Sequence, residues 1–213
     1  MAPLQLIGTP LSHFTRKVRI LLAELGIEVE LVRPPGVLAS APETYGGNPL
    51  MRVPTLVDGE LTLIESDHIA RYLVRKHDPD DRLGVRSDEV RDLNRRAVVN
   101  GVMANEVVLI LARRGGLTDI DGVAYFRKLA AAIDHGLAWL DQEVEVDAAR
   151  FDYGDIATIC MWQHLLHYQL RPDLDRYRRI AARVARFAER PSVASTTPAI
   201  SLADAAAAGW KPA

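Results

Sequence analysis

The sequence contains a single cysteine, Cys160, among its 213 residues. One cysteine cannot form a disulfide within the chain, and proteins of the reducing cytoplasm rarely contain disulfides. The first residues show no cationic stretch ahead of an apolar core, so we expect no secretory signal and a cytoplasmic protein. We interpret Cys160 as a small buried residue, because the helical pattern around it is apolar.

The net charge of the chain is also small, and long hydrophobic runs are absent from its sequence. Lys and Arg number 26 against 28 Asp and Glu, a formal charge of −2, which gives no basic field for nucleic acid or an anionic membrane surface. No apolar run approaches the roughly 18 residues of a membrane span. Apolar residues make up 48% of the chain, which is enough for a sizeable core. We therefore expect neither nucleic acid nor a membrane as a partner.

Hydrophobic periodicity predicts a small α/β domain at the N-terminal end. Residues 4–8 form a short apolar run typical of a buried strand, and residues 29–32 form another. Between them, apolar residues recur at helical spacing from Ser12, a good N-cap, to Gly26, a good residue to follow a helix. The opposite side of this predicted helix carries charged residues: Arg16, Lys17, Arg19 and Glu24.

A hairpin follows this unit. The runs at 55–57 and 61–64 flank an Asp-Gly pair, which favours a tight hairpin turn. Pro54 stands directly before the first run, where a residue without an N–H group is tolerated. We predict that the Val53-Pro54 peptide bond is cis. The stretch 34–49 is rich in Pro and Gly and predicts irregular structure with one short helical turn.

Beyond the hairpin the pattern is helical. A helix from about 66 to 76 follows directly, and the polar segment 78–81 predicts a linker. Four long helical periodicities come after it: 88–114, 123–143, 153–168 and 173–190. The predicted division is a domain of residues 1–77, a linker of residues 78–88 and an all-α domain of residues 89–213.

The motifs of the N-terminal third resemble the thioredoxin-like half of the soluble glutathione S-transferases. The resemblance rests on the segment 6–26, the pair Asn48-Pro49, the run 53–56 and the pair Glu65-Ser66. Within that superfamily, the chain is most similar to the bacterial group with a serine at the start of the first helix. The resemblance implies an N-terminal thioredoxin-like domain followed by a helical-bundle C-terminal domain. It also implies glutathione as co-substrate, no metal, and a homodimer.

A second signature of the family lies at the start of the helix predicted at 153–168. Asp152 stands three residues before Asp155, where relatives usually have Ser or Thr before Asp. An Asp at the cap accepts hydrogen bonds from the backbone amides of the first turn, and Asp155 can reach back to the N–H of the cap. We expect this capping box to stabilise the fold and to take no part in chemistry.

The family pattern implies a glutathione site around the hairpin. Val53, followed by Pro54, would pair its backbone with the cysteinyl unit of glutathione, as a strand is added to a sheet. Glu65 would hold the ammonium of the γ-glutamyl end. Ser66 would hold its carboxylate, because a helix N-terminus favours an anion.

Neighbouring charged residues leave alternatives open. Arg52, or alternatively His13, would neutralise the glycine carboxylate of glutathione, although Arg52 could equally be a plain solvated charge. Asp67 either contributes across a dimer interface or favours the N-terminus of its own helix, and we favour the second.

The chemistry implied by the family needs a thiolate, and a free thiol titrates near pH 8.5. Lowering that pKa by about two units takes roughly 2.7 kcal/mol. The hydroxyl of Ser12, at the positive end of a helix, can supply part of this by donating a hydrogen bond to the sulfur. Ser12 could instead only cap its helix, and Thr9, upstream, carries a similar hydroxyl. Because no cysteine stands at position 12, thiol exchange of the glutaredoxin kind is not expected.

The electrophile would be held by apolar positions of the helical domain, which are equally typical of a core. The candidates are Met103, Val107 and Tyr168, with Asn100, Ala104, Val108 and Trp210 as further positions. His164 and His167 lie three apart on one predicted helix, but a catalytic zinc site needs three protein ligands, so we expect no metal.

The sequence thus predicts a cytoplasmic, homodimeric glutathione transferase-like enzyme that activates the glutathione thiol for attack on a small hydrophobic electrophile. One alternative is a glutathione-dependent isomerase or dehalogenase, which uses the same thiolate. Another is a non-catalytic protein of the same fold that binds or regulates partners.

Overall fold

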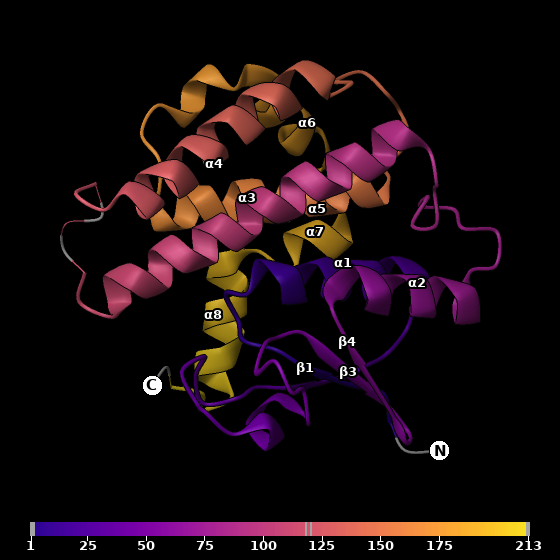
Figure 1. The fold of residues 1–213 in the computed structure, drawn as a ribbon. Helices are drawn as coiled ribbons and strands as arrows, with labels where there is room; N and C mark the ends of the chain where they lie inside the picture. Colours follow the sequence, from indigo (N-terminus) through magenta and orange to yellow (C-terminus); the bar gives the residue numbers. More distant parts are fainter. Residues whose placement is uncertain (1–2, 118, 120, 212–213) are drawn as a thin grey trace. The chain divides into compact units, whose positions relative to one another are not determined.

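The computed structural model describes residues 3–117, 119 and 121–211. A four-stranded sheet lies in its N-terminal part (Figure 1). The strands are β1 (Gln5–Ile7), β2 (Glu30–Val32), β3 (Thr55–Asp58) and β4 (Leu61–Ile64). Their order is β2-β1-β3-β4, with β1 and β2 parallel and the other two pairs antiparallel. A parallel pair needs a crossover connection, and helix α1 (His13–Leu25) supplies it.

Two helices cover one face of this sheet, α1 and α2 (Ser66–His77) (Figure 1). Leu6 and Leu56 are paired across β1 and β3, and both are fully buried. The predicted hairpin is present, with Gly59 at a positive φ of 61° in the turn between β3 and β4. The irregular stretch contains the short turn expected there, the 3-10 helix η1 (Pro42–Tyr45).

The charged side of α1 is largely covered by other parts of the chain. Lys17 is only 1% exposed, and its Nζ lies 2.6 Å from Oδ1 of Asp67 on α2. Arg16 is also buried, and its guanidinium donates to Oγ1 of Thr196 and to the backbone oxygen of Val193. Residues far along the chain cover this side of the helix, and helical periodicity alone does not reveal them.

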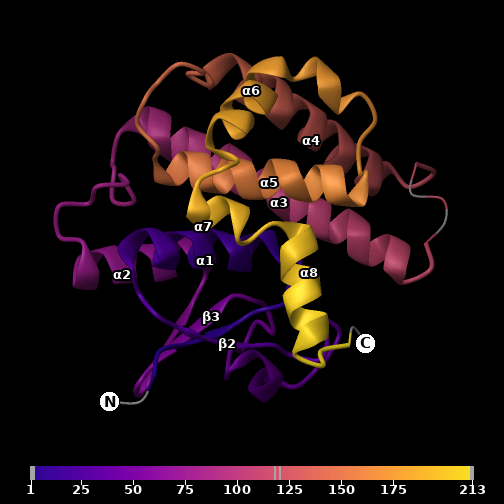
Figure 2. The same ribbon diagram turned by 180° about the vertical axis from the view of Figure 1, so that it is seen from behind.

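The C-terminal segment provides that cover (Figure 2). The helix expected at 173–190 is divided into η2 (Leu174–Arg176) and α6 (Arg178–Phe187), and it is followed by α7 (Pro191–Ala194) and α8 (Pro198–Ala207). Arg190 forms an ion pair with Glu24 at 2.6 Å, and Arg19 donates to Ser201 at 2.8 Å. Nε1 of Trp210 donates to the backbone oxygen of Pro34 at 2.8 Å. These contacts attach the end of the chain to the sheet domain.

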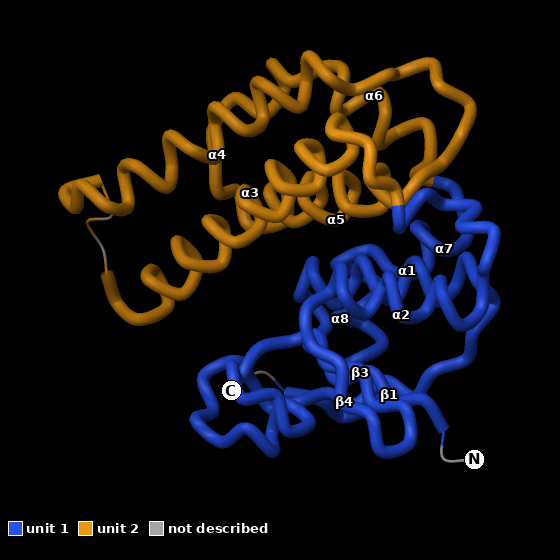
Figure 3. The backbone as a smooth tube through the Cα atoms, turned by 45° about the vertical axis from the view of Figure 1, so that its right-hand side comes forward, with its two compact units in different colours: residues 1–86, 189–213 blue, residues 87–188 orange. Residues whose placement is uncertain are grey.

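The chain therefore forms two compact units that are not continuous in sequence (Figure 3). The first contains Met1–Arg86 with Glu189–Ala213, and the second contains Ser87–Ala188. The predicted fold class, α/β followed by all-α, is confirmed. The second unit is shorter than the helical domain expected at 89–213, because α7 and α8 belong to the first.

The second unit is built around three long helices: α3 (Val90–Arg114), α4 (Ala124–Glu143) and α5 (Tyr153–Tyr168). Helices α3 and α4 approach closely at Gly136, where a Cβ atom would lie 2.7 Å from a methyl carbon of Val102. Helix α5 is buried on nearly all sides and includes Cys160, which is 1% exposed. In the part of the chain described, no helix has both the length and the apolar character to cross a membrane.

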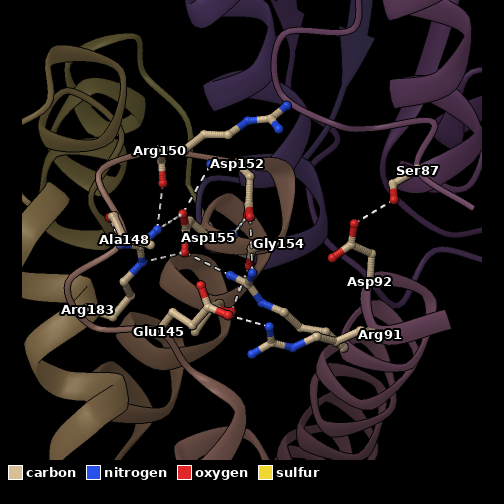
Figure 4. A network of polar contacts seen from close by, with 12 residues as sticks. Ser87, Arg91, Asp92, Glu145, Ala148, Arg150, Asp152, Gly154, Asp155 and Arg183 are labelled. Atoms are coloured by element: carbon tan, nitrogen blue, oxygen red, sulfur yellow. Dashed lines mark hydrogen bonds and ion pairs between the residues drawn. The ribbon is translucent and has the colours of Figure 1, made fainter. Parts of the chain in front are cut away.

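The predicted capping box is present at the start of α5 (Figure 4). The Asp152 side chain accepts from the backbone N–H of Asp155 at 2.7 Å, and Asp155 accepts from the N–H of Asp152 at 3.1 Å. Arg95 of α3 and Arg183 of α6 both donate to the same Asp155 carboxylate. The box therefore caps the N-terminus of α5 and also joins α5 to α3 and α6.

Candidate functional site

The register of the sheet brings the predicted site segments to one edge. Ile7, the last residue of β1, is paired with Thr55, the first residue of β3. Thr55 is also paired with Ile64, the last residue of β4. The three segments that leave or enter the sheet at this row therefore begin side by side: the turn to Ser12, the Val53-Pro54 peptide and the start of α2 at Glu65.

The Val53-Pro54 peptide bond is cis, as predicted. The turn before it is held by Asn48, which is buried. Nδ2 of Asn48 donates to the backbone oxygen of Arg52 at 2.8 Å, and Oδ1 accepts from the N–H of Leu50 at 2.9 Å. Within the described residues, neither the N–H nor the C=O of half-buried Val53 is hydrogen-bonded. Its backbone can therefore pair with an extended peptide.

Glu65 has an unusual backbone conformation, with φ 69° and ψ 122°. Side chains with a Cβ atom rarely occupy this region, and such residues gather at ligand-binding sites where the surrounding structure enforces them. The side chain of Glu65 is exposed, whereas Ser66, at the first turn of α2, is buried. The first-turn amides of α2 and an exposed carboxylate thus lie next to each other, which suits a ligand that carries both charges.

Asp67 has a role that the sequence did not suggest. Its ion pair with the buried Lys17 joins the first turn of α2 to the middle of α1. Asp67 therefore has an ion-pair partner within its own chain, and this ion pair holds the N-terminal turn of α2 against α1.

Ser12 is the N-cap of α1. Its Oγ accepts from the N–H of Thr15 at 3.1 Å, and its own N–H donates to the backbone oxygen of Thr9 at 3.2 Å. A serine hydroxyl that accepts a hydrogen bond still has its proton to donate. The capping contact therefore leaves Ser12 able to donate to an anion at the positive end of α1. Thr9 and Ser12 are both half-buried in this turn.

Two candidate cations differ in access. Arg52 is exposed, whereas His13 is 2% exposed and packs edge-on against Phe14, with ring centroids 4.7 Å apart. Because His13 is buried, Arg52 is the more accessible partner for a carboxylate at this edge of the sheet.

The residues of the helical unit that were predicted to contact the electrophile differ in burial. Met103 is fully buried and belongs to the core, whereas Val107 and Tyr168 are half-buried. His164 is buried and His167 is exposed, and both rings pack against Tyr168, with centroid distances of 4.7 and 5.0 Å.

Sequence reasoning missed Glu106, one turn along α3 from Met103. Glu106 is 0% exposed, and its carboxylate contacts Nδ1 of His164. Burial raises the pKa of Glu106 well above its usual range. Burial, followed by the charges of His167 and Arg114, lowers the pKa of His164 to about 3. A lone Glu within the apolar face of a helix was the available signal, because glutamates are almost never fully buried without a partner.

Comparisons with known proteins give one consistent result. A family model for the glutathione S-transferase N-terminal domain matches residues 6–81. Glutathione S-transferase 1 of Zea mays is 30% identical over 217 residues, which cover 91% of this chain and 95% of that protein. Glutathione S-transferase 4 of Zea mays is 42% identical over 76 residues, so that the chain matches only 34% of the length of that relative.

A solved structure extends the similarity to the whole fold. The crystal structure of a glutathione S-transferase from Methylobacillus flagellatus KT, with GSH bound, has a TM-score of 0.76 to this chain at 27% identity. The match covers 92% of this chain and 99% of that one.

Proposed function

The chain belongs to the glutathione S-transferase family, and we propose that it binds glutathione at the edge of its sheet and activates the thiol for attack on a small apolar electrophile. The observation that supports the proposal is the row Ile7–Thr55–Ile64, from which the segments that lead to Ser12, to Val53 and to α2 start at one edge of the sheet. The glutathione in the Methylobacillus flagellatus structure supports this choice of ligand.

Each part of glutathione has a matching group at this edge. The cysteinyl backbone pairs with the N–H and C=O of Val53. The γ-glutamyl ammonium binds the exposed carboxylate of Glu65, and its carboxylate binds Ser66 at the N-terminus of α2. The glycine carboxylate binds Arg52. The ligand's charges are thereby met by groups of opposite charge or by helix-terminal amides.

Ser12 supplies the chemistry. Its hydroxyl, oriented by the capping bond to Thr15, donates to the sulfur and favours the thiolate over the thiol. The thiolate then attacks the electrophile: a carbon–sulfur bond forms, the leaving group departs with the electron pair of its bond, and the thiol proton passes to solvent. We assign the apolar contacts of the electrophile to Val107 and Tyr168 of the helical unit, the two half-buried candidates, with Met103 packed in the core beneath them.

We further propose, from the family resemblance, that the protein works as a cytoplasmic homodimer. Equilibrium sedimentation tests the assembly, and a monomer at micromolar concentration would contradict it.

The proposed function is tested by binding and turnover measured on the same samples. Calorimetric titration should show one glutathione site per chain, and Glu65→Gln should weaken it about tenfold through the loss of a charge-assisted contact. Glu60→Gln, an exposed change in the same hairpin, is the matched control and should not affect binding. Wild-type protein should conjugate glutathione to 1-chloro-2,4-dinitrobenzene with release of chloride.

The outcomes separate the alternatives. Absence of glutathione binding contradicts the proposal altogether. Binding without turnover of aryl halides, but with turnover of a glutathione-dependent isomerase or haloalkane substrate, favours the same thiolate with another electrophile. Binding without any turnover favours a non-catalytic protein of the same fold.

A further inference from the structure

Four side chains form a continuous row along α3 and α5 of the helical unit. The carboxylate of Glu106 contacts Nδ1 of His164, and the His164 ring packs on Tyr168 with centroids 4.7 Å apart. The Tyr168 hydroxyl accepts from Nη2 of Arg114 at 3.2 Å, and the guanidinium carbon lies 5.9 Å from the centre of the Tyr168 ring. The row therefore runs from a fully buried end at Glu106 to an exposed end at Arg114.

An apolar strip runs beside this row and ends at the same arginine. Met103, Val107, Ile110 and Arg114 follow one another at intervals of four, three and four residues, which places them on one side of α3. Met103 and Ile110 are buried, so the accessible part of the strip consists of half-buried Val107 and exposed Arg114. Such a strip fits a ligand with an apolar body and a polar group at one end.

The charge at the exposed end is not balanced by a neighbouring acid. Arg95 and Arg171 of the same unit form ion pairs with aspartates, but no carboxylate is paired with Arg114 among the residues described. Glu106, at the buried end of the row, contacts His164 rather than Arg114, and burial raises its pKa, which disfavours the charged carboxylate. The charges of Arg114 and His167 are both felt at His164, where they help to lower the pKa. The end of the row is therefore electropositive.

We propose that Arg114 and Tyr168 form a subsite for the carboxylate of an electrophile whose apolar body lies along Val107. This inference rests on the proposed function and specifies its substrate class: an apolar electrophile with one anionic end. The guanidinium binds one carboxylate oxygen or both as a planar fork. The Tyr168 hydroxyl, which accepts from Arg114, has its proton to donate to the same carboxylate. Burial raises the pKa of Tyr168, so that this proton is retained.

The test uses two probes of equal size, 4-chloro-3-nitrobenzoate and 4-chloro-3-nitrobenzamide. Only the benzoate is charged, and in both the thiolate would attack the carbon that bears chlorine and expel chloride. Binding is measured by calorimetry on the full chain with and without S-methylglutathione, whose blocked sulfur cannot react. Wild-type protein should bind the benzoate about 5- to 20-fold more tightly than the benzamide, the range expected for a charge-assisted contact at a partly exposed site.

Variants assign the preference to the subsite. Arg114→Gln should remove it by weakening the benzoate and leaving the benzamide unchanged within about twofold. Arg114→Lys should restore part of it, because a point charge without the planar fork remains. Arg113→Gln removes the same charge from the adjacent exposed position and should leave the preference intact. Rising salt should reduce the preference of wild-type protein, as expected for an exposed charge.

Each outcome has a definite meaning. Equal binding of the two probes by wild-type protein, or equal losses in Arg113→Gln and Arg114→Gln, would overturn the subsite. A preference for the benzoate that Arg114→Gln leaves unchanged would also overturn it. Failure of the proposed function is seen separately, as failure of S-methylglutathione itself to bind, because the benzoate and benzamide titrations without it still report on Arg114.

Discussion

Arg183 and Asp155 form a two-pronged contact inside the helical unit, with Nε 2.9 Å from Oδ1 and Nη2 2.7 Å from Oδ2. Both residues are buried. Arg95 and the backbone N–H of Asp152 donate to the same carboxylate, so that its oxygens are fully used. A buried carboxylate with this many donors cannot be removed without leaving buried positive charge behind.

Asp155→Ala should therefore destabilise the protein severely. Loss of one partner from a buried ion pair costs about 3–5 kcal/mol, which exceeds the roughly 0.5–2 kcal/mol of a lost helix cap. The free energy of unfolding from urea titration measures it. Asp152→Ser, which keeps a capping oxygen at a partly exposed position, is the control and should cost less than about 1 kcal/mol. Equal costs for the two variants would show that the arginines contribute nothing.

The same network shows what a sequence can predict. The Asp152–Asp155 box is local, and its spacing of three residues was enough to place it correctly. Arg95 and Arg183 come from other helices, and nothing in their neighbourhood in the sequence marks them as partners of Asp155. Local capping and periodicity predicted α1 to α5, and the turn residues and Pro54 predicted the hairpin and the cis peptide. The single helix expected at 173–190 is divided, and the pairing of distant charges became visible only in the fold.

Substitutions of Glu65 distinguish the effect of its strained backbone on stability from the effect of its carboxylate on glutathione binding. With φ 69° and ψ 122°, its backbone should cost on the order of 1–3 kcal/mol, a cost that glycine avoids. Glu65→Gly should therefore be more stable than Glu65→Ala by about 1 kcal/mol, the reverse of the usual order of these residues. Both variants lose the carboxylate and should bind glutathione about tenfold more weakly. Thermal denaturation and calorimetry measure the two effects, and an alanine variant more stable than the glycine variant would contradict the argument.

The candidate site was predicted only in part, for a similar reason. Ser12, Val53 and Glu65 are recognised from motifs, and the register Ile7–Thr55–Ile64 brings their segments together. The burial of Lys17 was missed, because helical periodicity reports the polarity of a face and not what later packs on it. Its partner Asp67 lies 50 residues away in sequence.

The buried pair Glu106–His164 should make stability depend on pH. Burial raises the pKa of Glu106 from 4.5 and lowers that of His164 from 6.5 to about 3. Between pH 4.5 and 6.5, the folded pair and the unfolded chain each hold one proton on these two groups, so their contribution is flat. Above pH 6.5 the unfolded chain holds none, and stability falls by about 1.4 kcal/mol per pH unit until the folded pKa of Glu106 is reached. Below pH 4.5 it falls again, because the unfolded chain holds two.

Glu106→Gln isolates the contribution of the carboxyl group. The variant cannot lose a proton on unfolding, so its stability relative to wild type should rise as the pH increases above the unfolded pKa of Glu106, until the raised folded pKa is reached. Urea unfolding at several pH values measures the difference. Glu89→Gln, an exposed change at the start of α3, is the control and should give a difference that does not vary with pH. A constant difference for Glu106→Gln as well would show that Glu106 is ionised in the folded protein.

Ser12→Ala should keep glutathione binding and lose most of the turnover. Val53, Glu65 and Ser66 still hold the tripeptide, but the hydrogen bond to the thiolate is gone. Such bonds contribute about 1.5–3 kcal/mol, so the rate near neutral pH should fall roughly 10- to 150-fold. The apparent pKa of the bound thiol should rise, and higher pH should restore part of the rate.

The capping bond to Thr15 adds a second effect that must be separated from the first, since its loss should lower stability by about 1 kcal/mol. Ser12→Asp keeps a cap but places negative charge against the sulfur, so it should be stable and at least as inactive as Ser12→Ala. Stopped-flow titration of the thiolate and steady-state rates across pH measure both effects. If Ser12→Ala kept full activity and Thr9→Val lost it, the donor would be Thr9. If neither variant changed the rate or its pH profile, activation of the thiol by a hydroxyl of this turn would be wrong.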